Sequence, residues 1–242
     1  MARRVLCVIP ARYGSTRLPA KPLLEINGIP LVMWSYNRAV ESGVFSDVCI
    51  ATDDRRIMET VERFGGKAMM TSPSHKSGTD RVNEVANAIE CTHVVNLQGD
   101  EPDVPLEIIR NFAAGLDQID DYGLLTIVSH AKIDEVGSPH VVKAVVGSSG
   151  DALYFSRSII PFDRDAACEQ LFYKHHGIYG FTRQSLSRFC SLPQGTLEKR
   201  ESLEQLRALE HGMRIRCLVE DFVSSGIDTA EDLERFRAHH AK

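Results

Sequence analysis

The stretch VIPARYGSTRLPAKPL, Val8 to Leu23, joins the end of an apolar run to a loop rich in cations, hydroxyls and prolines. Its cations are Arg12, Arg17 and Lys21, and none of the first 24 residues is Asp or Glu. The apolar run, Arg4 to Pro10, is continuous, which is typical of a strand buried on both faces. We therefore expect a first strand followed by a loop that holds an anion.

The loop lacks the two common phosphate-binding patterns. No Gly-Lys-Ser/Thr follows Gly14, which excludes a Walker A loop, and G-x-G-x-x-G is absent, which excludes a dinucleotide fingerprint. Its prolines and spaced cations suit an extended loop around a polyphosphate, with Arg as a forked donor and Lys as a point charge. A solvated basic loop is the alternative interpretation.

Strand and helix patterns alternate outward from this loop to about residue 130. We expect helices over Pro30–Ser42, Asp54–Phe64, Gly78–Glu90 and Pro105–Gln118, and strands over Asp47–Thr52, Thr92–Gln98 and Leu124–Ser129. The continuous apolar strands predict an α/β fold with a mostly parallel, Rossmann-like sheet and helices on both faces. Ligands of such sheets bind beyond the carboxyl ends of the strands, where the cationic loop lies.

The pattern changes after about residue 130. HVVKAVVGSSGDALYFS predicts two strands joined at Ser148–Gly150, and YKHHGIYGF predicts another. We then expect a helix over Arg200–Glu210, a strand over Arg214–Val219 and a final helix over Thr229–His240. The sequence thus predicts one domain over 1–242, with an inserted β-rich subdomain or sheet extension at about 130–185.

Composition narrows the function classes. The chain has 242 residues, 43% of them hydrophobic and 25% charged, and its net charge of -5 argues against a nucleic-acid or membrane surface. Its six cysteines are scattered and form no C-x-x-C pair, which indicates buried, reduced thiols and a cytoplasmic protein. No apolar run approaches the roughly 18 residues of a membrane span.

A second chemical signal is VVNLQGDEP, Val94 to Pro102, where an apolar strand ends in carboxylates. Mg²⁺ prefers one or two carboxylates together with waters and substrate phosphates. Asp100 lies nearest the strand end and is the candidate ligand. A plain acidic turn at a helix start is the alternative interpretation.

Eight segments occur in an order that resembles the CMP-KDO synthetases, or 3-deoxy-manno-octulosonate cytidylyltransferases, where KDO is 3-deoxy-manno-octulosonate. The resemblance covers nearly the whole chain. The segments are IPARYGSTRLPAKPL, ATDD, SGTDRVNEV, NLQGDEP, ALYFSRSIIPF, KHHGIYGF, SLEQLRALEHG and GIDTAEDLERF.

The resemblance implies a nucleotidyltransferase that converts CTP and KDO to CMP-KDO and pyrophosphate, with Mg²⁺ as cofactor, in lipopolysaccharide or capsule biosynthesis. It also implies a homodimer whose β-rich subdomain serves sugar binding and dimerisation. The implied nucleotide-binding residues are Ala11, Arg12, Ser15, Arg17, Lys21, Ser77, Gly78, Arg81, Gln98 and Asp100. The implied sugar-binding residues are Gln98, Arg157, His175, Tyr179, Glu204 and Gln205. The implied catalytic residues are Arg12, Lys21, Asp100 and Asp228, of which Asp100 and Asp228 are the metal ligands.

Two local alternatives accompany these assignments. Asp228 precedes Thr229, a candidate N-cap of the final helix, so Asp228 is either a second Mg²⁺ ligand or itself the cap. Glu204 and Gln205 are expected to be adjacent on a helix, pointing about 100° apart, so that only one faces a ligand squarely.

Other functions stay open at this point. A CMP-sialate synthetase shares CTP and a 2-keto sugar acid, although GSTRLPAKPL and SLEQLR fit the KDO type better. A hexose-1-phosphate nucleotidyltransferase and a non-catalytic nucleotide-binding module are further alternatives. His176, SPHVVK and SSGID depart from the family pattern, which leaves a distally modified octulosonate as an alternative substrate.

Overall fold

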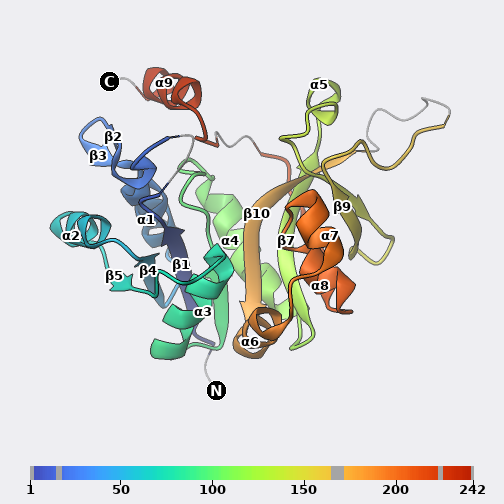
Figure 1. Cartoon of the computed structure of the whole chain (residues 1–242), viewed down its shortest axis with the longest axis horizontal. Helices are drawn as coiled ribbons and strands as arrows, with labels where there is room; N and C mark the ends of the chain where they lie inside the picture. Colours follow the sequence, from blue (N-terminus) through green and yellow to red (C-terminus); the bar gives the residue numbers. More distant parts are fainter. Residues whose placement is uncertain (1–2, 15–17, 165–171, 223–225, 241–242) are drawn as a thin grey trace. The chain divides into compact units, whose positions relative to one another are not determined.

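The computed structural model in Figure 1 describes residues 3–14, 18–164, 172–222 and 226–240. The chain forms two compact units. The first comprises Met1–Ala113 and Val223–Lys242, and the second comprises Ala114–Phe222. The predicted inserted segment at about 130–185 falls within the second unit, and the single-domain assignment stays a prediction.

The first unit is built on a parallel sheet. Its strands are β1 (Val5–Ala11), β4 (Asp47–Thr52), β5 (Ala68–Met70) and β6 (His93–Asn96). They lie side by side in the order β6-β1-β4-β5, and each neighbouring pair is parallel. All but one residue of β1 and of β4 is buried, so both faces of these strands are covered. The predicted strand over Asp47–Thr52 is confirmed residue for residue.

Helices connect these strands, and their starts follow capping chemistry. They are α1 (Leu31–Ser42), α2 (Arg55–Arg63), α3 (Gly78–Ala88), α4 (Leu106–Gly115) and α9 (Ala230–His239). Asp54 accepts from the Arg56 amide at 2.9 Å, and Ser77 accepts from the Asp80 amide at 3.1 Å. A side-chain acceptor satisfies an amide that the first turn leaves unpaired, which is why Asp and Ser begin these helices.

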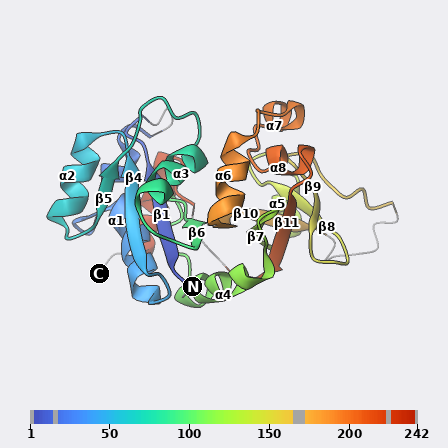
Figure 2. The ribbon, with the colours of Figure 1, turned by 90° about the horizontal axis from the view of Figure 1, so that it is seen from below.

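Successive strands are added on opposite sides of β1, with β4 on one side and β6 on the other, as the first unit in Figure 2 shows. From β1 the chain moves outward to β4 and β5, and it then returns to add β6 on the other side of β1. A crevice opens at such a switch point, outside the carboxyl ends of the two strands. The loops that follow β1 and β6 therefore flank the expected ligand site.

The end of the chain packs against the cationic loop. Leu18, Leu31, Ile227 and Phe236 belong to one buried apolar cluster, which joins α9 to α1. The hairpin of β2 (Glu25–Ile26) and β3 (Ile29–Pro30) and the short 3-10 helix η1 (Lys21–Leu23) link the loop to α1, and the hairpin adds Ile26 to the same cluster. This packing places the residues near 228 beside the cationic loop that follows β1.

The second unit has a mixed sheet. Its strands are β7 (Gly123–His130), β8 (Lys143–Val146), β9 (Ala152–Ser156), β10 (Tyr173–Thr182) and β11 (Arg214–Val219). Strand β7 runs parallel to β11 and antiparallel to β10, while β8 pairs antiparallel with both β10 and β9. The predicted β8–β9 hairpin and the predicted strand Arg214–Val219 are confirmed. The helical elements are η2 (Leu116–Gln118), α5 (Ile133–Val136), α6 (Arg183–Ser191), α7 (Thr196–Glu201) and α8 (Leu206–Glu210).

The expected single helix over Arg200–Glu210 is wrong. Helix α7 ends at Glu201, Ser202 adopts a left-handed conformation with φ of 51°, and α8 begins only at Leu206. The apolar spacing continues across the break because Leu203 and Leu206 are both buried. Glu204 and Gln205 therefore lie in the connecting turn and not on a helix.

The described cysteines are free thiols, as expected. Cys7, Cys49 and Cys217 are buried, and burial raises the pKa of Cys49 to about 11 and that of Cys217 to about 12. Cys168 lies outside the described residues. Within the described ranges, no helix has the length and apolar character that crossing a membrane requires.

Candidate active site

Lys21, Asp100 and Asp228 meet in the first unit. The Lys21 Nζ atom lies 3.1 Å from Asp100 Oδ2 and 3.1 Å from Asp228 Oδ1. The Lys21 side chain is only 14% exposed, whereas those of Asp100 and Asp228 are 40% and 47% exposed. One ammonium group is thus shared by two carboxylates that still reach solvent.

Three separate segments supply these side chains. Lys21 begins η1, and Asp100 lies in the turn that follows β6. Asp228 is brought beside Asp100 by a backbone hydrogen bond from the Ile227 amide to the Asp100 carbonyl, 2.9 Å long. The cluster therefore lies at the predicted edge of the sheet, beyond the carboxyl ends of β1 and β6.

Asp228 does not cap the final helix. The N-cap of α9 is Thr229, whose hydroxyl accepts from the Asp232 amide at 3.2 Å. Asp232 in turn accepts from the amides of Asp228 and Thr229, at 3.0 Å and 2.9 Å. The capping alternative for the Asp228 side chain is wrong, because the cap is complete without its carboxylate.

The donor set of this cluster fits a magnesium ion shared with a substrate. Two carboxylate oxygens that each lie 3.1 Å from one Nζ atom are separated by at most twice that distance. Mg²⁺ is commonly bound by one or two carboxylates, with substrate phosphates and waters completing an octahedron. No group of three or more His, Cys, Asp and Glu in the described ranges is placed to hold a metal ion. A cation bound here therefore needs ligands beyond these side chains, which a triphosphate supplies.

The cationic loop begins with an exposed residue directly after β1. Ala11 ends β1 and is buried, whereas Arg12 is exposed. Among the residues that the structure describes, none forms a hydrogen bond or ion pair with the Arg12 side chain. Ser15 and Arg17, two of the predicted nucleotide-binding residues, lie outside the described residues.

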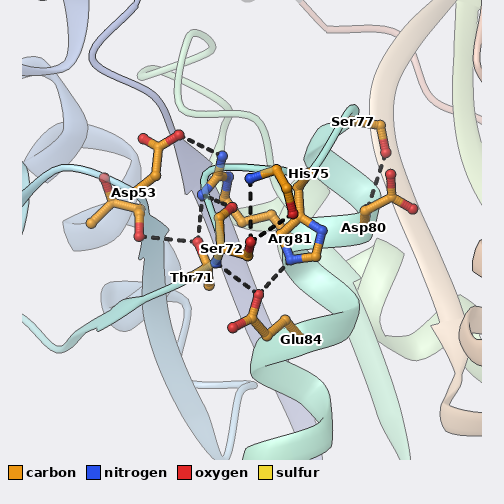
Figure 3. Close-up of polar contacts among 10 residues, drawn as sticks. Asp53, Thr71, Ser72, His75, Ser77, Asp80, Arg81 and Glu84 are labelled. Carbon is orange, nitrogen blue, oxygen red and sulfur yellow. Dashed lines mark hydrogen bonds and ion pairs between the residues drawn. The ribbon is translucent and has the colours of Figure 1, made fainter.

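Arg81 is the most deeply buried of the predicted nucleotide-binding residues that the structure describes, with 0% exposure. Its Nη2 lies 2.8 Å from Asp53 Oδ2, and its Nη1 donates to Thr71 Oγ1 at 2.5 Å (Figure 3). A charge removed from water needs such partners, because an unpaired buried guanidinium is very costly. The Arg81 side chain is therefore committed to its own unit.

Glu84 of α3 organises the segment before Ser77 (Figure 3). Its Oε2 accepts from the Ser72 amide at 3.0 Å and forms a short contact with His75 Nε2. These contacts hold the pKa of Glu84 below its ordinary value, with the Ser72 amide as the main cause. Arg81 and Glu84, one turn of α3 apart, thus fix the segment that leads to the predicted Ser77 and Gly78.

Gln98 lies in the first unit, close after β6. Its Nε2 donates to Asn96 Oδ1 at 3.4 Å, and Asn96 donates to Thr79 Oγ1 at 3.3 Å. This chain of amides ties the strand end that carries Asp100 to the first turn of α3, which carries Gly78.

Arg157 is held by backbone carbonyls in the second unit. Its Nε donates to Glu201 O at 2.8 Å, its Nη1 to Pro139 O at 3.0 Å, and its Nη2 to Ser202 O at 3.5 Å. A guanidinium carries five N–H donors, so one donor on each Nη atom remains for a ligand. The same contacts fix the turn after α7, from which Glu204 and Gln205 project.

The buried side chain of Lys143 contacts the backbone of Arg157. It is 0% exposed, and its Nζ donates to the carbonyls of Ser138, Val141 and Arg157, at 2.9, 2.8 and 2.6 Å. Desolvation, and secondarily the charge of Arg157, lower the pKa of Lys143. The three carbonyls satisfy all three ammonium donors, which is the condition for burying a charge without an acidic partner.

His175, Tyr179 and Gln205 form a neutral group in the same unit. The Tyr179 hydroxyl donates to Gln205 Oε1 at 3.1 Å, and the rings of His175 and Tyr179 lie 5.5 Å apart. Desolvation lowers the pKa of His175 to about 3 and raises that of Tyr179 well above its ordinary value. All three side chains are therefore uncharged at neutral pH, and Glu204 lies in the same turn as Gln205.

The family model and two curated relatives that match the chain are all cytidylyltransferases. A cytidylyltransferase family model matches residues 6–215 of the chain. The 3-deoxy-manno-octulosonate cytidylyltransferase of Thermodesulfovibrio yellowstonii is 46% identical over 95% of each chain, and that of Desulfatibacillum aliphaticivorans is 47% identical over 97% of this chain and 98% of the relative. The chain belongs to the 3-deoxy-manno-octulosonate cytidylyltransferase family.

A solved structure supports the same family and its fold. The structure of a CMP:2-keto-3-deoxy-manno-octonic acid synthetase complexed with CTP is 41% identical to the chain, covers 98% of each chain and superposes with a TM-score of 0.93. The predicted fold class, a mostly parallel nucleotidyltransferase sheet with helices, is thereby confirmed.

The sequence did not predict the residues whose hydrogen bonds fix the predicted binding residues in place. Asp53, Thr71 and Glu84 fix Arg81 and its segment, while Lys143 and Glu201 fix Arg157. Asp53 had a detectable signal, because the quoted ATDD places a carboxylate directly after a buried strand. Thr71 and Glu201 had none, since a single Thr after a strand or a single Glu at the end of a helix is common in any protein.

Proposed function

We propose that the chain transfers the cytidylyl group of CTP to KDO, giving CMP-KDO and pyrophosphate. The observation that carries this proposal is the Lys21–Asp100–Asp228 cluster at the switch point of the parallel sheet, in a chain of this family. The names of the relatives indicate the sugar, and the solved relative complexed with CTP indicates the nucleotide.

The chemistry explains the charges. The nucleophile is the anomeric hydroxyl of a sugar acid, whose carboxylate must approach a triphosphate. Two like charges about 4 Å apart repel by about 4 kcal/mol at an effective dielectric constant near 20. Left uncompensated, this repulsion alone slows the reaction roughly a thousandfold. Arg12 and Lys21 offset it from the protein side.

We assign Mg²⁺ to Asp100 and Asp228 as the cofactor. When bound there it would neutralise phosphate charge and lower the pKa of the attacking hydroxyl. Arg12 and Lys21 bind the phosphates, and Lys21 holds its positive charge beside the departing pyrophosphate. The hydroxyl attacks the α-phosphorus in line, so no covalent intermediate with the protein forms, and positioning and electrostatics carry the rate.

The nucleoside is assigned to the start of α3 and the end of β1. A Cβ atom at Gly78 would lie 3.3 Å from Pro10 Cγ, so glycine permits the close approach of these two segments. Ala11, Ser77 and Gly78 line this approach in the proposal. Arg81 acts here as a positioning residue, because its buried guanidinium is occupied by Asp53 and Thr71.

The sugar is assigned to the neutral group and to Arg157. The two remaining donors of Arg157 suit the carboxylate of KDO as a forked contact. The buried Nε2 of Gln205 has no hydrogen-bond partner among the described residues, and a sugar hydroxyl satisfies such a donor.

Pyrophosphate release tests the substrate assignment. CTP, ATP, GTP, UTP and dTTP are each combined with KDO, a distally modified octulosonate, sialic acid and glucose 1-phosphate, with and without Mg²⁺. We expect release only with CTP, KDO and Mg²⁺ together, and 31P NMR should identify CMP-KDO. Release with sialic acid or glucose 1-phosphate in place of KDO would overturn the assignment, and release without added Mg²⁺ in chelator would overturn the cofactor.

We also propose a cytoplasmic homodimer that serves lipopolysaccharide or capsule biosynthesis. Leu153, Ile159 and Phe162 support the dimer, because these apolar side chains are 64%, 56% and 87% exposed in the β-rich part of the second unit. Sedimentation of the wild type should give twice the chain mass, and a Phe162→Ser variant should shift it toward the monomer.

A further inference from the structure

A bulge interrupts β10 opposite Thr126 of β7. His176 pairs with Ile127, but the next pair along the ladder is Tyr179 with Thr126, so Gly177 and Ile178 are additional residues in β10. Bulges of this kind occur next to active sites, where they redirect a side chain. Here the bulge lies between His175 and Tyr179, two of the residues assigned to the sugar.

The Thr126 hydroxyl occupies the centre of this bulge. The residue is 0% exposed, and its Oγ1 lies 2.9 Å from Ile178 O and 3.2 Å from His176 O. The third neighbour of Oγ1 is His175 Nε2, at 3.0 Å. Carbonyl oxygens only accept hydrogen bonds, and a hydroxyl has a single proton to donate.

Counting protons fixes the state of the imidazole. If the Thr126 proton pointed to His175, both carbonyl oxygens would face the lone pairs of Oγ1 at hydrogen-bond distance without a proton between them. The proton therefore goes to a carbonyl, with Ile178 O the nearer, and Oγ1 accepts from His175. A neutral imidazole carries one proton, so Nε2 holds it and Nδ1 is an acceptor.

A complementary donor lies in the same group. Tyr179 donates to Gln205 Oε1, which fixes the orientation of that amide and leaves its buried Nε2 without a partner among the described residues. His175 Nδ1 likewise has no partner in the described part of the chain. One acceptor and one donor suit hydroxyl groups, which both donate and accept.

We propose that Thr126 is a positioning residue that fixes the Nε2–H tautomer of His175, so that Nδ1 accepts a hydrogen bond from a sugar hydroxyl. The proposal rests on the proposed function for the identity of the sugar. It assigns His175 to a hydroxyl and not to the carboxylate, because a neutral acceptor and a carboxylate present lone pairs to one another. Burial keeps the imidazole of His175 neutral, and burial also holds the neighbouring His176 and Tyr179 uncharged at neutral pH.

The tautomer is measured directly on the wild type by NMR of 15N-histidine-labelled protein. The His175 signals are assigned by their absence from the spectrum of His175→Gln. We expect a protonated Nε2 and an unprotonated Nδ1 from pH 6 to pH 8. A proton on Nδ1, or on both nitrogens, would overturn the proposal without any reference to activity.

Two variants at Thr126 test the role in recognition. Thr126→Val keeps the shape and removes the hydroxyl, whereas Thr126→Ser keeps the hydroxyl. In Thr126→Val the Nδ1–H tautomer should become populated and the KM for KDO should rise about tenfold, with the KM for CTP within twofold of wild type. Thr126→Ser should retain the wild-type tautomer and the KDO KM to within about threefold.

The outcomes separate this proposal from the proposed function. An unchanged KDO KM in folded Thr126→Val overturns the positioning role even if the panel confirms CMP-KDO synthesis. If the wild type uses another sugar acid, the proposed function fails, and the same KM comparison with that sugar decides the role of Thr126. If Thr126→Val fails to fold, Thr126→Ala replaces it and the wild-type spectrum still decides the tautomer.

Discussion

The charged cluster of the first unit and the neutral group of the second use opposite physical means. Lys21, Asp100 and Asp228 are charged groups, and both carboxylates are at least 40% exposed. His175 and Tyr179 are uncharged at neutral pH because burial shifts the pKa of each away from neutrality. Charges suit a place where charge moves during the reaction, and directed hydrogen bonds suit a place where a fixed pattern of hydroxyls is recognised.

This difference has a kinetic consequence. Interactions that strengthen in the transition state raise kcat, whereas interactions that are equal in the ground state and the transition state only lower KM. Variants of the charged cluster should therefore reduce turnover, and variants of the neutral group should raise the sugar KM.

The largest effect is expected for Asp228→Asn. Because Asn keeps the size but not the charge, turnover should fall at least about a hundredfold, or roughly 2.7 kcal/mol of barrier. The melting temperature should stay within a few degrees of wild type, because Thr229 and Asp232 complete the cap of α9. Raised Mg²⁺, or Mn²⁺, should partly restore the rate.

Thr229→Ala is the matched control for this change. It removes the cap without touching a carboxylate of the cluster, so it should lower the unfolding free energy by about 1 kcal/mol and leave turnover near wild type. Wild-type turnover of Asp228→Asn at limiting Mg²⁺ would show that Asp228 is not a ligand.

Lys21→Ala is expected to have the next largest effect. Since charge builds on pyrophosphate as its bond breaks, turnover should fall roughly thirtyfold, or about 2 kcal/mol, and equilibrium CTP binding should weaken less. Stopped-flow turnover and calorimetric CTP binding measure the two quantities. Unchanged turnover with a higher CTP KM would show that Lys21 binds CTP equally in the ground state and the transition state. The kinetic difference between the charged cluster and the neutral group would then not hold for Lys21.

The sequence predicts these two groups to different extents. Strands Asp47–Thr52 and Arg214–Val219 were predictable to the residue, because continuous apolar runs are bounded by charged residues or turns. The meeting of Asp100 with Asp228 was predicted from motifs, since no local pattern says where a distant loop returns. It depends on the packing of Ile227 and Phe236 in the apolar cluster beneath α9.

The neutral group was harder to predict because its chemistry depends on tertiary contacts. The break at Ser202 was hidden by apolar spacing that continues through it, so Gln205 was expected on a helix. Thr126 stands as one polar residue in the run Leu124–Val128, where a β-branched Thr is also an ordinary strand residue. Only its three neighbours reveal its role.

Acid should destabilise the folded second unit, because burial holds His175 and His176 there in the neutral form. In the unfolded chain a histidine protonates near pH 6.5, but in the folded chain burial lowers the pKa of His175 to about 3 and that of His176 to about 4. Between these values the unfolded state binds more protons, so stability falls as pH falls below about 6.5. By pH 5 each histidine should cost about 1–2 kcal/mol.

Urea unfolding from pH 7.5 to pH 5 measures this loss. His176→Gln removes one titrating group and keeps an amide near Ser129, which contacts His176 Nε2 at 2.9 Å in the wild type. The variant should therefore lose less stability on acidification than the wild type. Equal slopes for the two proteins would show that His176 is not held neutral by burial.

The smallest effect is expected for Tyr179→Phe. This change removes the hydroxyl that donates to Gln205 Oε1 and leaves the ring in place, so the amide loses the contact that orients its Nε2. The KDO KM should rise roughly fivefold, about 1 kcal/mol, with kcat and the CTP KM within twofold of wild type. Tyr173→Phe is the matched control, because Tyr173 lies on the same strand and is adjacent to His130, away from Gln205. It should change neither KM. A fall in kcat of Tyr179→Phe larger than the rise in KM would place Tyr179 with the charged cluster in function, and the division between turnover and recognition would then be wrong at this residue.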